Sequence, residues 1–137
     1  HFGDGTQDIM GQLKLSTRVK HLGVGPMEKQ ADEAERYLKR LPEVVDGLKA
    51  YDLLLYQAGA DAHINDPLGG WMTSDQLRRR DRIAFAAAKR IGLPVAWNLA
   101  GGYQRDADGG IEPVLAIHRE TMRACAQVYA DAQSVSV

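Results

Sequence analysis

Two short apolar runs, at residues 51–56 and 95–99, flank a stretch whose apolar residues recur at helical spacing. A strand that is apolar on consecutive residues is typical of a parallel sheet that helices cover on both faces. Parallel neighbours also need a crossover connection, which is usually a helix. The pattern therefore predicts an α/β fold with a three-layer αβα arrangement around a parallel sheet.

The helix between these two strands has clear start and stop signals. Thr73 and Gln76 match a capping box, in which each side chain satisfies a free backbone N–H of the other residue. Gly92, followed closely by Pro94, is typical of a helix end. We expect this helix to span residues 73–91. Its predicted inward residues are Leu77, Ala84, Ala87, Ala88 and Ile91.

Further elements extend the alternation of strands and helices. A short helix is expected over residues 6–13 and a strand over residues 18–24. A helix is expected over residues 27–49, where Pro42 kinks it or starts a second helix, and another over residues 113–132. The predicted inward stripe of this last helix is Leu115, His118, Met122, Cys125 and Tyr129.

Length and composition predict a single soluble domain over residues 1–137. The 17 Lys and Arg residues balance 18 Asp and Glu residues, which argues against a nucleic-acid partner. A single cysteine cannot form an internal disulfide and favours a reducing, cytoplasmic location. No apolar run is long enough to cross a membrane, so we expect no membrane partner.

Polar loops follow both apolar strands, and the carboxyl ends of parallel strands are where ligands bind in such sheets. The loop at residues 57–70 contains Asp61, His63 and Asp66, which could contribute to a metal site or simply form a turn-rich surface loop. The loop at residues 98–104 places Tyr103 after two glycines. Its hydroxyl could stabilise an oxyanion, or the segment could be a plain glycine turn.

A third candidate lies at the start of the chain. His1 with Asp4 could belong to a metal site, because imidazole is a common ligand and the glycines around Asp4 allow tight packing. A histidine at the first position can also be the remnant of a tag or of a chance cut. The Gly-Asp-Gly loop normally follows a strand, so we expect the chain to be the C-terminal part of a longer protein.

The remaining polar residues are better explained by structure. His21 lies in a strand pattern and His118 on the stripe of the last helix, so both are predicted to be structural. The arginines at positions 78–80 and 82 lie near acids on an amphipathic helix, which predicts a solvated face with salt bridges. Cys125 lies among apolar residues and is predicted to be an inert core thiol.

Taken in order, the three loops resemble motifs of the histone deacetylase superfamily, which has the arginase/deacetylase fold. Residues 1–6 resemble the end of its Asp-x-His-x-Gly-Asp/Asn-Gly-Thr motif, residues 59–69 its second metal loop, and residues 99–104 its Gly-Gly-Tyr loop. The resemblance covers essentially all of the chain but only the C-terminal portion of the family's domain. The short spacer between the first two motifs is similar to that of the bacterial deacetylase-like branch.

The resemblance implies a zinc-dependent amide hydrolase that removes an acetyl group through a metal-activated water. The implied substrate is a small-molecule or peptide N-acyl amine, such as acetyl-lysine or an acetylpolyamine. His1 and Asp66 match ligands of one catalytic Zn²⁺, with Asp61 and Asp4 as supporting acids. Tyr103 matches the tyrosine that polarises the scissile carbonyl and stabilises the oxyanion.

The same resemblance extends to the substrate pocket and to what the sequence lacks. Gly101 and Gly102 match the backbone of the pocket floor, and Met72 is expected to line the acyl-lysine tunnel. The family's first metal carboxylate and its paired general-base histidines precede the position of His1. The alternative is therefore a non-catalytic fragment or binding module of this fold, whose open sheet edge would favour self-association.

Overall fold

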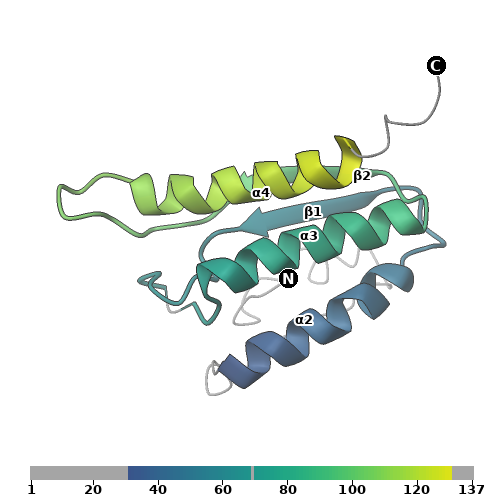
Figure 1. Ribbon diagram of the computed structural model, residues 1–137, viewed down its shortest axis with the longest axis horizontal. Helices are drawn as coiled ribbons and strands as arrows, with labels where there is room; N and C mark the ends of the chain where they lie inside the picture. The colour runs from purple at the N-terminus through teal and green to yellow at the C-terminus, as the bar shows by residue number, and fades with distance from the viewer. Residues whose placement is uncertain (1–30, 69, 131–137) are drawn as a thin grey trace, which may run out of the picture.

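A computed structural model describes residues 31–68 and 70–130 of the chain. The described elements are, in order, helix α2 (Ala31–Asp46), strand β1 (Leu54–Gly59), helix α3 (Ser74–Arg90), strand β2 (Val95–Ala100) and helix α4 (Glu112–Ala130) (Figure 1). The elements predicted over residues 6–13 and 18–24, including His21, lie outside the described residues. No helix in the described part is long and apolar enough to cross a membrane.

The two strands form a parallel pair, as the sequence predicts. Leu54 lies opposite Val95 and Gly59 opposite Ala100, so the strands end together. Helix α3 is the crossover between them. The α/β class with a parallel sheet is therefore confirmed, and the loops after β1 and β2 leave the sheet at the same end, on the left in Figure 1.

Helix α3 begins and ends where its capping residues predict. The Thr73 hydroxyl accepts the backbone N–H of Gln76, while the Gln76 side chain accepts the backbone N–H of Thr73 at 2.9 Å. Gly92 follows the helix with φ +69°, a conformation that glycine adopts without the steric cost of a Cβ. Of the predicted inward residues, Leu77, Ala84, Ala87 and Ala88 are buried, and Ile91 is partly buried.

Helix α2 continues through Pro42 as one helix, so the predicted second helix does not form. Leu38, Leu41 and Val45 on its inner face are buried. The last two pack with alanines of α3 and with the inner face of both strands, which is how this helix is held against the rest of the fold.

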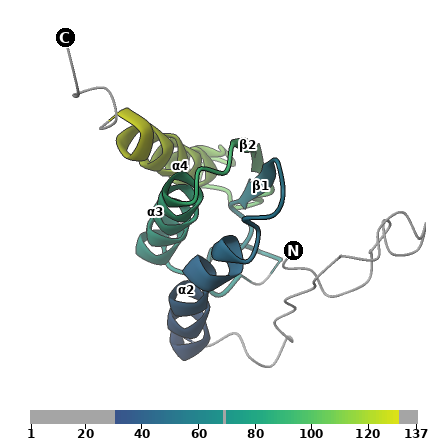
Figure 2. The ribbon, with the colours of Figure 1, turned by 90° about the vertical axis from the view of Figure 1, so that its right-hand side faces the viewer.

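The sheet is covered on one face only within the described part of the chain. The three described helices lie on the same side of β1 and β2 (Figure 2). Tyr56 and Trp97 face these helices and pack around Phe85 of α3. Leu55 points the other way and is 75% exposed. Leu55 is therefore not buried as the sequence predicts, and no described helix lies over this second face.

Helix α4 turns a different face inward from the predicted stripe. Leu115 and Met122 are exposed, at 40% and 50%, although both were expected inside. Its buried residues are Val114, Ile117, His118, Thr121 and Ala124. Of the expected stripe only His118 is buried. The spacing of apolar residues predicts the wrong buried face of α4 because Thr121, a polar residue, is fully buried against α3.

Candidate functional site

The two loops at the carboxyl end of the sheet are hydrogen-bonded to each other. The backbone N–H of Ala60 donates to the carbonyl of Ala100 at 2.8 Å, which extends the strand pairing by one step. Beyond it, the backbone N–H of Tyr103 donates to Asp66 Oδ2 at 2.8 Å. The structure thus joins two of the residues that the sequence singles out, one from each loop.

Asp66 is a buried carboxylate with both oxygens held by the backbone. Oδ2 accepts from Tyr103, and Oδ1 accepts from the backbone N–H of Leu68 at 3.0 Å. Asp66 as a whole is only 4% exposed. Each carboxylate oxygen keeps a further lone pair, so these two bonds fix the orientation of the group without exhausting its capacity to bind a cation.

Asp61 fills the gap between the ends of the two strands. A Cβ placed on Gly59 or on Gly101 would lie 2.5 Å from Asp61 Oδ1, so Asp61 would have to shift to admit a side chain at either position. Gly101 also has φ +58°, in the left-handed region that favours glycine. The carboxylate of Asp61 therefore lies against the start of both loops.

Tyr103 combines a fixed backbone with an accessible side chain. Its N–H is bound to Asp66, while the residue is 50% exposed. Gly102, just before it, has φ +101°, and a Cβ there would lie 2.5 Å from Val114 Cγ1 of α4. Both glycines are thus needed for the backbone path that brings Tyr103 to Asp66.

His63 is committed to internal hydrogen bonds. Its Nδ1 accepts the backbone N–H of Asn65 at 3.1 Å, so the ring proton is on Nε2, which donates to Ser74 Oγ at 2.9 Å. Burial lowers the pKa of His63, and the nearby charge of Asp66 offsets this in part. The sequence leaves two interpretations of His63 open, a metal ligand or a structural residue of the loop. The contacts favour the structural role, because neither ring nitrogen is free to bind a metal.

This neutral histidine makes stability depend on pH. Because the pKa of His63 is lower in the folded protein, the unfolded state binds more protons near the ordinary histidine pKa of about 6.5. The free energy of unfolding should therefore fall as the pH drops below that value. We expect His63→Gln to reduce this fall, measured by urea unfolding between about pH 7.5 and 5.5. An identical pH slope in both proteins would contradict the assignment.

Asp66 is the described residue whose surroundings best suit a metal ion. Asp66 has no Lys or Arg partner among the described ion pairs, and a buried carboxylate without a cation is costly. Its donor chemistry and its two orienting N–H groups suit a divalent ion. No group of three or more potential ligands occurs within the described residues. His1 and Asp4, the other predicted residues, lie outside them.

The structure places Met72 in the core, against the expectation that it lines a tunnel. It is fully buried and packs with Leu77 of α3 and Ile117 of α4. Its backbone carbonyl accepts the N–H of Ile64 at 2.7 Å, which closes the loop that carries Asp66. The tunnel role fails because the side chain has no exposed surface, and Met72 instead anchors the loop.

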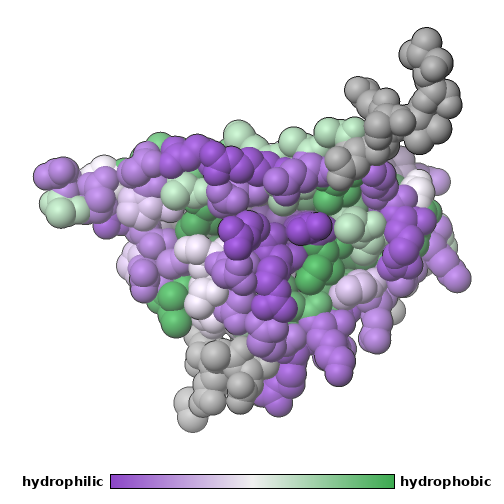
Figure 3. Space-filling view, viewed as in Figure 1, coloured by the Kyte–Doolittle hydropathy of each residue, from purple (hydrophilic) through white to green (hydrophobic). Residues whose placement is uncertain are grey.

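The sequence-based interpretation of the arginine run is right for three residues and wrong for one. Arg78 and Arg79 are exposed and pair with Asp75 and Glu35, and Arg82 is exposed. Hydrophilic side chains accordingly cover much of the α3 and α4 surface in Figure 3. Arg80, however, is buried and pairs with Asp81. Helical spacing gives the signal for this, because positions 77, 80, 81 and 84 share one face.

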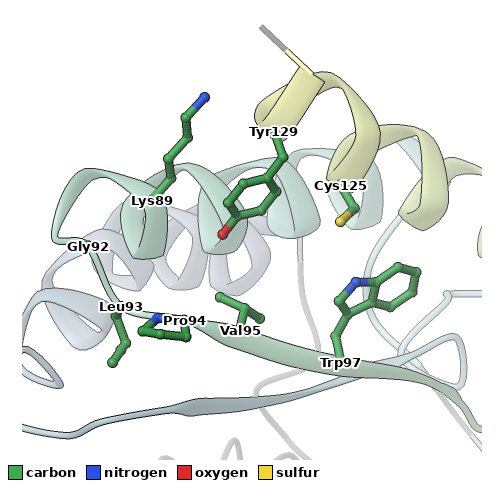
Figure 4. Close-up of a pocket in the computed structure, with 8 residues that line it drawn as sticks. All are labelled: Lys89, Gly92, Leu93, Pro94, Val95, Trp97, Cys125 and Tyr129. Atoms are coloured by element: carbon green, nitrogen blue, oxygen red, sulfur yellow. The ribbon is translucent and has the colours of Figure 1, made fainter. Parts of the chain in front are cut away.

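A separate apolar cavity of about 440 Å³ lies at the other end of β2, between α3 and the last turns of α4. Figure 4 shows the side chains of Cys125 and Tyr129 pointing from α4 toward β2. Cys125 is partly buried at its edge, which corrects the prediction of a core thiol. This cavity is far along the strands from the two loops and is not part of the candidate site.

Comparison with known proteins adds a family relationship. The sequence model of the histone deacetylase domain matches residues 17–112, which include Asp61, Asp66 and Tyr103. An uncharacterized protein of Picosynechococcus sp. (strain ATCC 27264 / PCC 7002 / PR-6) is 31% identical over 145 residues. That alignment covers 94% of this chain and 47% of the relative, so the chain spans about half the length of the curated protein it matches. No solved structure matches the chain significantly.

Proposed function

Because the chain belongs to the histone deacetylase domain family, we propose that the protein removes an acetyl group from an amine, such as acetyl-lysine or an acetylpolyamine, with a bound Zn²⁺. The observation that carries the proposal is the 2.8 Å hydrogen bond from the Tyr103 N–H to Asp66 Oδ2. It joins a residue that resembles the family's zinc ligand to one that resembles its oxyanion donor. Two such residues must lie close together to act on the same carbonyl.

Asp66 is the described residue suited to hold the metal. When bound, a zinc ion would supply a water of near-neutral pKa and polarise the substrate carbonyl. The contribution of Asp66 is a negative charge of fixed orientation, since the N–H groups of Leu68 and Tyr103 prevent rotation of the carboxylate. We propose His1 as a further ligand, on its resemblance to the family's motif.

Tyr103 would act on the substrate directly. Its hydroxyl would donate a hydrogen bond to the carbonyl oxygen as negative charge develops there. Because this hydrogen bond is stronger in the transition state than in the ground state, it would lower the activation barrier. The backbone bond to Asp66 and the left-handed glycines before it hold the residue in place, so little reorganisation is needed. Its exposed side chain remains accessible to a substrate that approaches from solvent.

The test is hydrolysis by the full-length protein that carries this sequence. After metal removal with a chelator and reloading with Zn²⁺, we expect release of acetate from an acetyl-lysine peptide or from an acetylated diamine. Hydrolysis should disappear on chelation and return with zinc. The second candidate is a non-catalytic binding module of this fold; within residues 31–68 and 70–130 no group of three or more potential metal ligands lies together. Zinc-loaded protein that binds acetylated amines without hydrolysing them would support that alternative.

A further inference from the structure

A buried ion pair lies beside the end of strand β1, next to the candidate site. The side chains of Arg80 and Asp81 are only 4% and 1% exposed, and Arg80 Nε donates to Asp81 Oδ1 at 2.8 Å. A second arm of the same guanidinium, Nη1, donates to the backbone carbonyl of Gly59 at 2.8 Å. Arg80 therefore connects an acid on α3 with the residue at which β1 ends.

Asp81 extends this connection to two more elements. It accepts hydrogen bonds from the Tyr56 hydroxyl of β1 and from the Thr121 hydroxyl of α4, the latter at 2.6 Å. Burial raises the pKa of Tyr56 well above its ordinary value, so its hydroxyl keeps the proton that it donates. Asp81 is thus an acceptor shared by β1, α3 and α4, and Arg80 is the member of this group that also contacts Gly59.

Stability alone does not account for this arrangement. A buried ion pair costs so much desolvation that apolar residues of similar volume often stabilise a fold as well or better. Arg80 Nη2 also has no hydrogen-bond partner among the described residues, a further cost. What a guanidinium adds is a rigid fork, which can bind Asp81 and the carbonyl of Gly59 at the same time.

The carbonyl of Gly59 lies where both site loops begin. Gly59 pairs with Ala100, and the carboxylate of Asp61 packs against Gly59 and Gly101 together. A shift of this strand end would move Asp61 and, through the loop, Asp66. It would also disturb the backbone that brings the N–H of Tyr103 to Asp66.

We propose that Arg80 is a positioning residue of the site, which holds the end of β1 so that Asp66 and Tyr103 meet. The metal-binding consequence rests on the proposed function, whereas the positioning of the two loops does not. Thr121→Val is the matched control, because it removes a buried hydrogen bond from Asp81 but leaves the contact between Arg80 and Gly59 intact.

The first measurement is amide hydrogen exchange in the metal-free full-length protein. In Arg80→Lys a compact ammonium replaces the rigid fork whose separate nitrogens bind Asp81 and the carbonyl of Gly59. We therefore expect exchange at the N–H of Tyr103 and of Ala60 to quicken about tenfold or more, while Thr121→Val keeps the wild-type rates there. Equal changes in both variants, or none in Arg80→Lys, would overturn the proposal.

The second measurement is zinc affinity by competition with a chelating dye. We expect about 10–100-fold weaker binding in Arg80→Lys and near wild-type affinity in Thr121→Val, as for outer residues that orient a ligand. A wild-type protein that binds no zinc would refute the proposed function, whereas the exchange experiment would still decide the role of Arg80. If Arg80→Lys does not fold, the double variant Arg80→Met with Asp81→Asn removes the same contact without leaving a buried charge. We then expect faster exchange and weaker zinc binding in this double variant.

Discussion

Replacing Tyr103 with phenylalanine in the full-length, zinc-loaded protein should lower kcat for deacetylation by about a hundredfold or more, in line with the loss of an oxyanion donor. The substitution removes only the hydroxyl. The bond from the Tyr103 N–H to Asp66 belongs to the backbone, so the contact between the two loops should survive. We expect KM to change little, because the lost interaction forms only as charge develops on the carbonyl oxygen.

The control for this experiment is Tyr51→Phe. Tyr51 is also an exposed tyrosine, at 42%, but it precedes β1 and so lies at the opposite end of the strand from the site loops. It should keep wild-type kcat and KM. Steady-state kinetics on an acetyl-lysine peptide measure both variants. A Tyr103→Phe protein with unchanged kcat would remove the proposed oxyanion role, and equal losses in the two variants would point to a general effect on folding.

Asp66→Asn should weaken zinc binding by more than about a hundredfold, beyond the cost of losing a residue that only orients a ligand. Two effects act together. The neutral amide no longer balances the charge of the metal ion. In addition, the NH₂ group would face one of the two backbone N–H groups, of Leu68 or Tyr103, that the carboxylate now accepts. The variant therefore loses both the ligand and part of the contact between the loops.

Competition with a chelating dye measures this loss without any assay of activity. Asp108→Asn provides the control, because Asp108 is exposed on the loop that follows Tyr103 and its hydrogen bond to Asp106 is made by its backbone N–H, which the substitution keeps. It should retain wild-type zinc affinity. Tight zinc binding by Asp66→Asn would show that the metal is held elsewhere, and with it the assignment of Asp66 would be wrong.

The elements that the sequence predicts well are those specified by neighbouring residues. The capping box of Thr73 and Gln76 places the start of α3, and Gly92 places its end. The apolar runs give the positions of β1 and β2 to within a few residues. Such signals are local, since each depends on backbone groups only a few positions away.

The errors occur where a residue's environment comes from distant parts of the chain. Arg80 looks like one more member of a charged run, yet its partners include the carbonyl of Gly59, 21 positions away. Thr121 is a polar residue of α4 outside the predicted inward stripe, yet it lies in the core, where its hydroxyl donates to Asp81. For His63 the sequence leaves a metal-ligand and a structural role open, and its contacts with Asn65 and Ser74 favour the structural one.

By itself the sequence determined the order of the elements, the parallel pairing of the strands, the family and two residues of the candidate site, Asp66 and Tyr103. These follow from periodicity, capping and short motifs, which act over one or two turns of chain. The tertiary structure alone decided that Asp66 binds the backbone of Tyr103, that Met72 is buried and that Arg80 donates to the carbonyl of Gly59. Those facts depend on which donors and acceptors meet after packing, because a buried polar group must find its partner wherever the fold brings one.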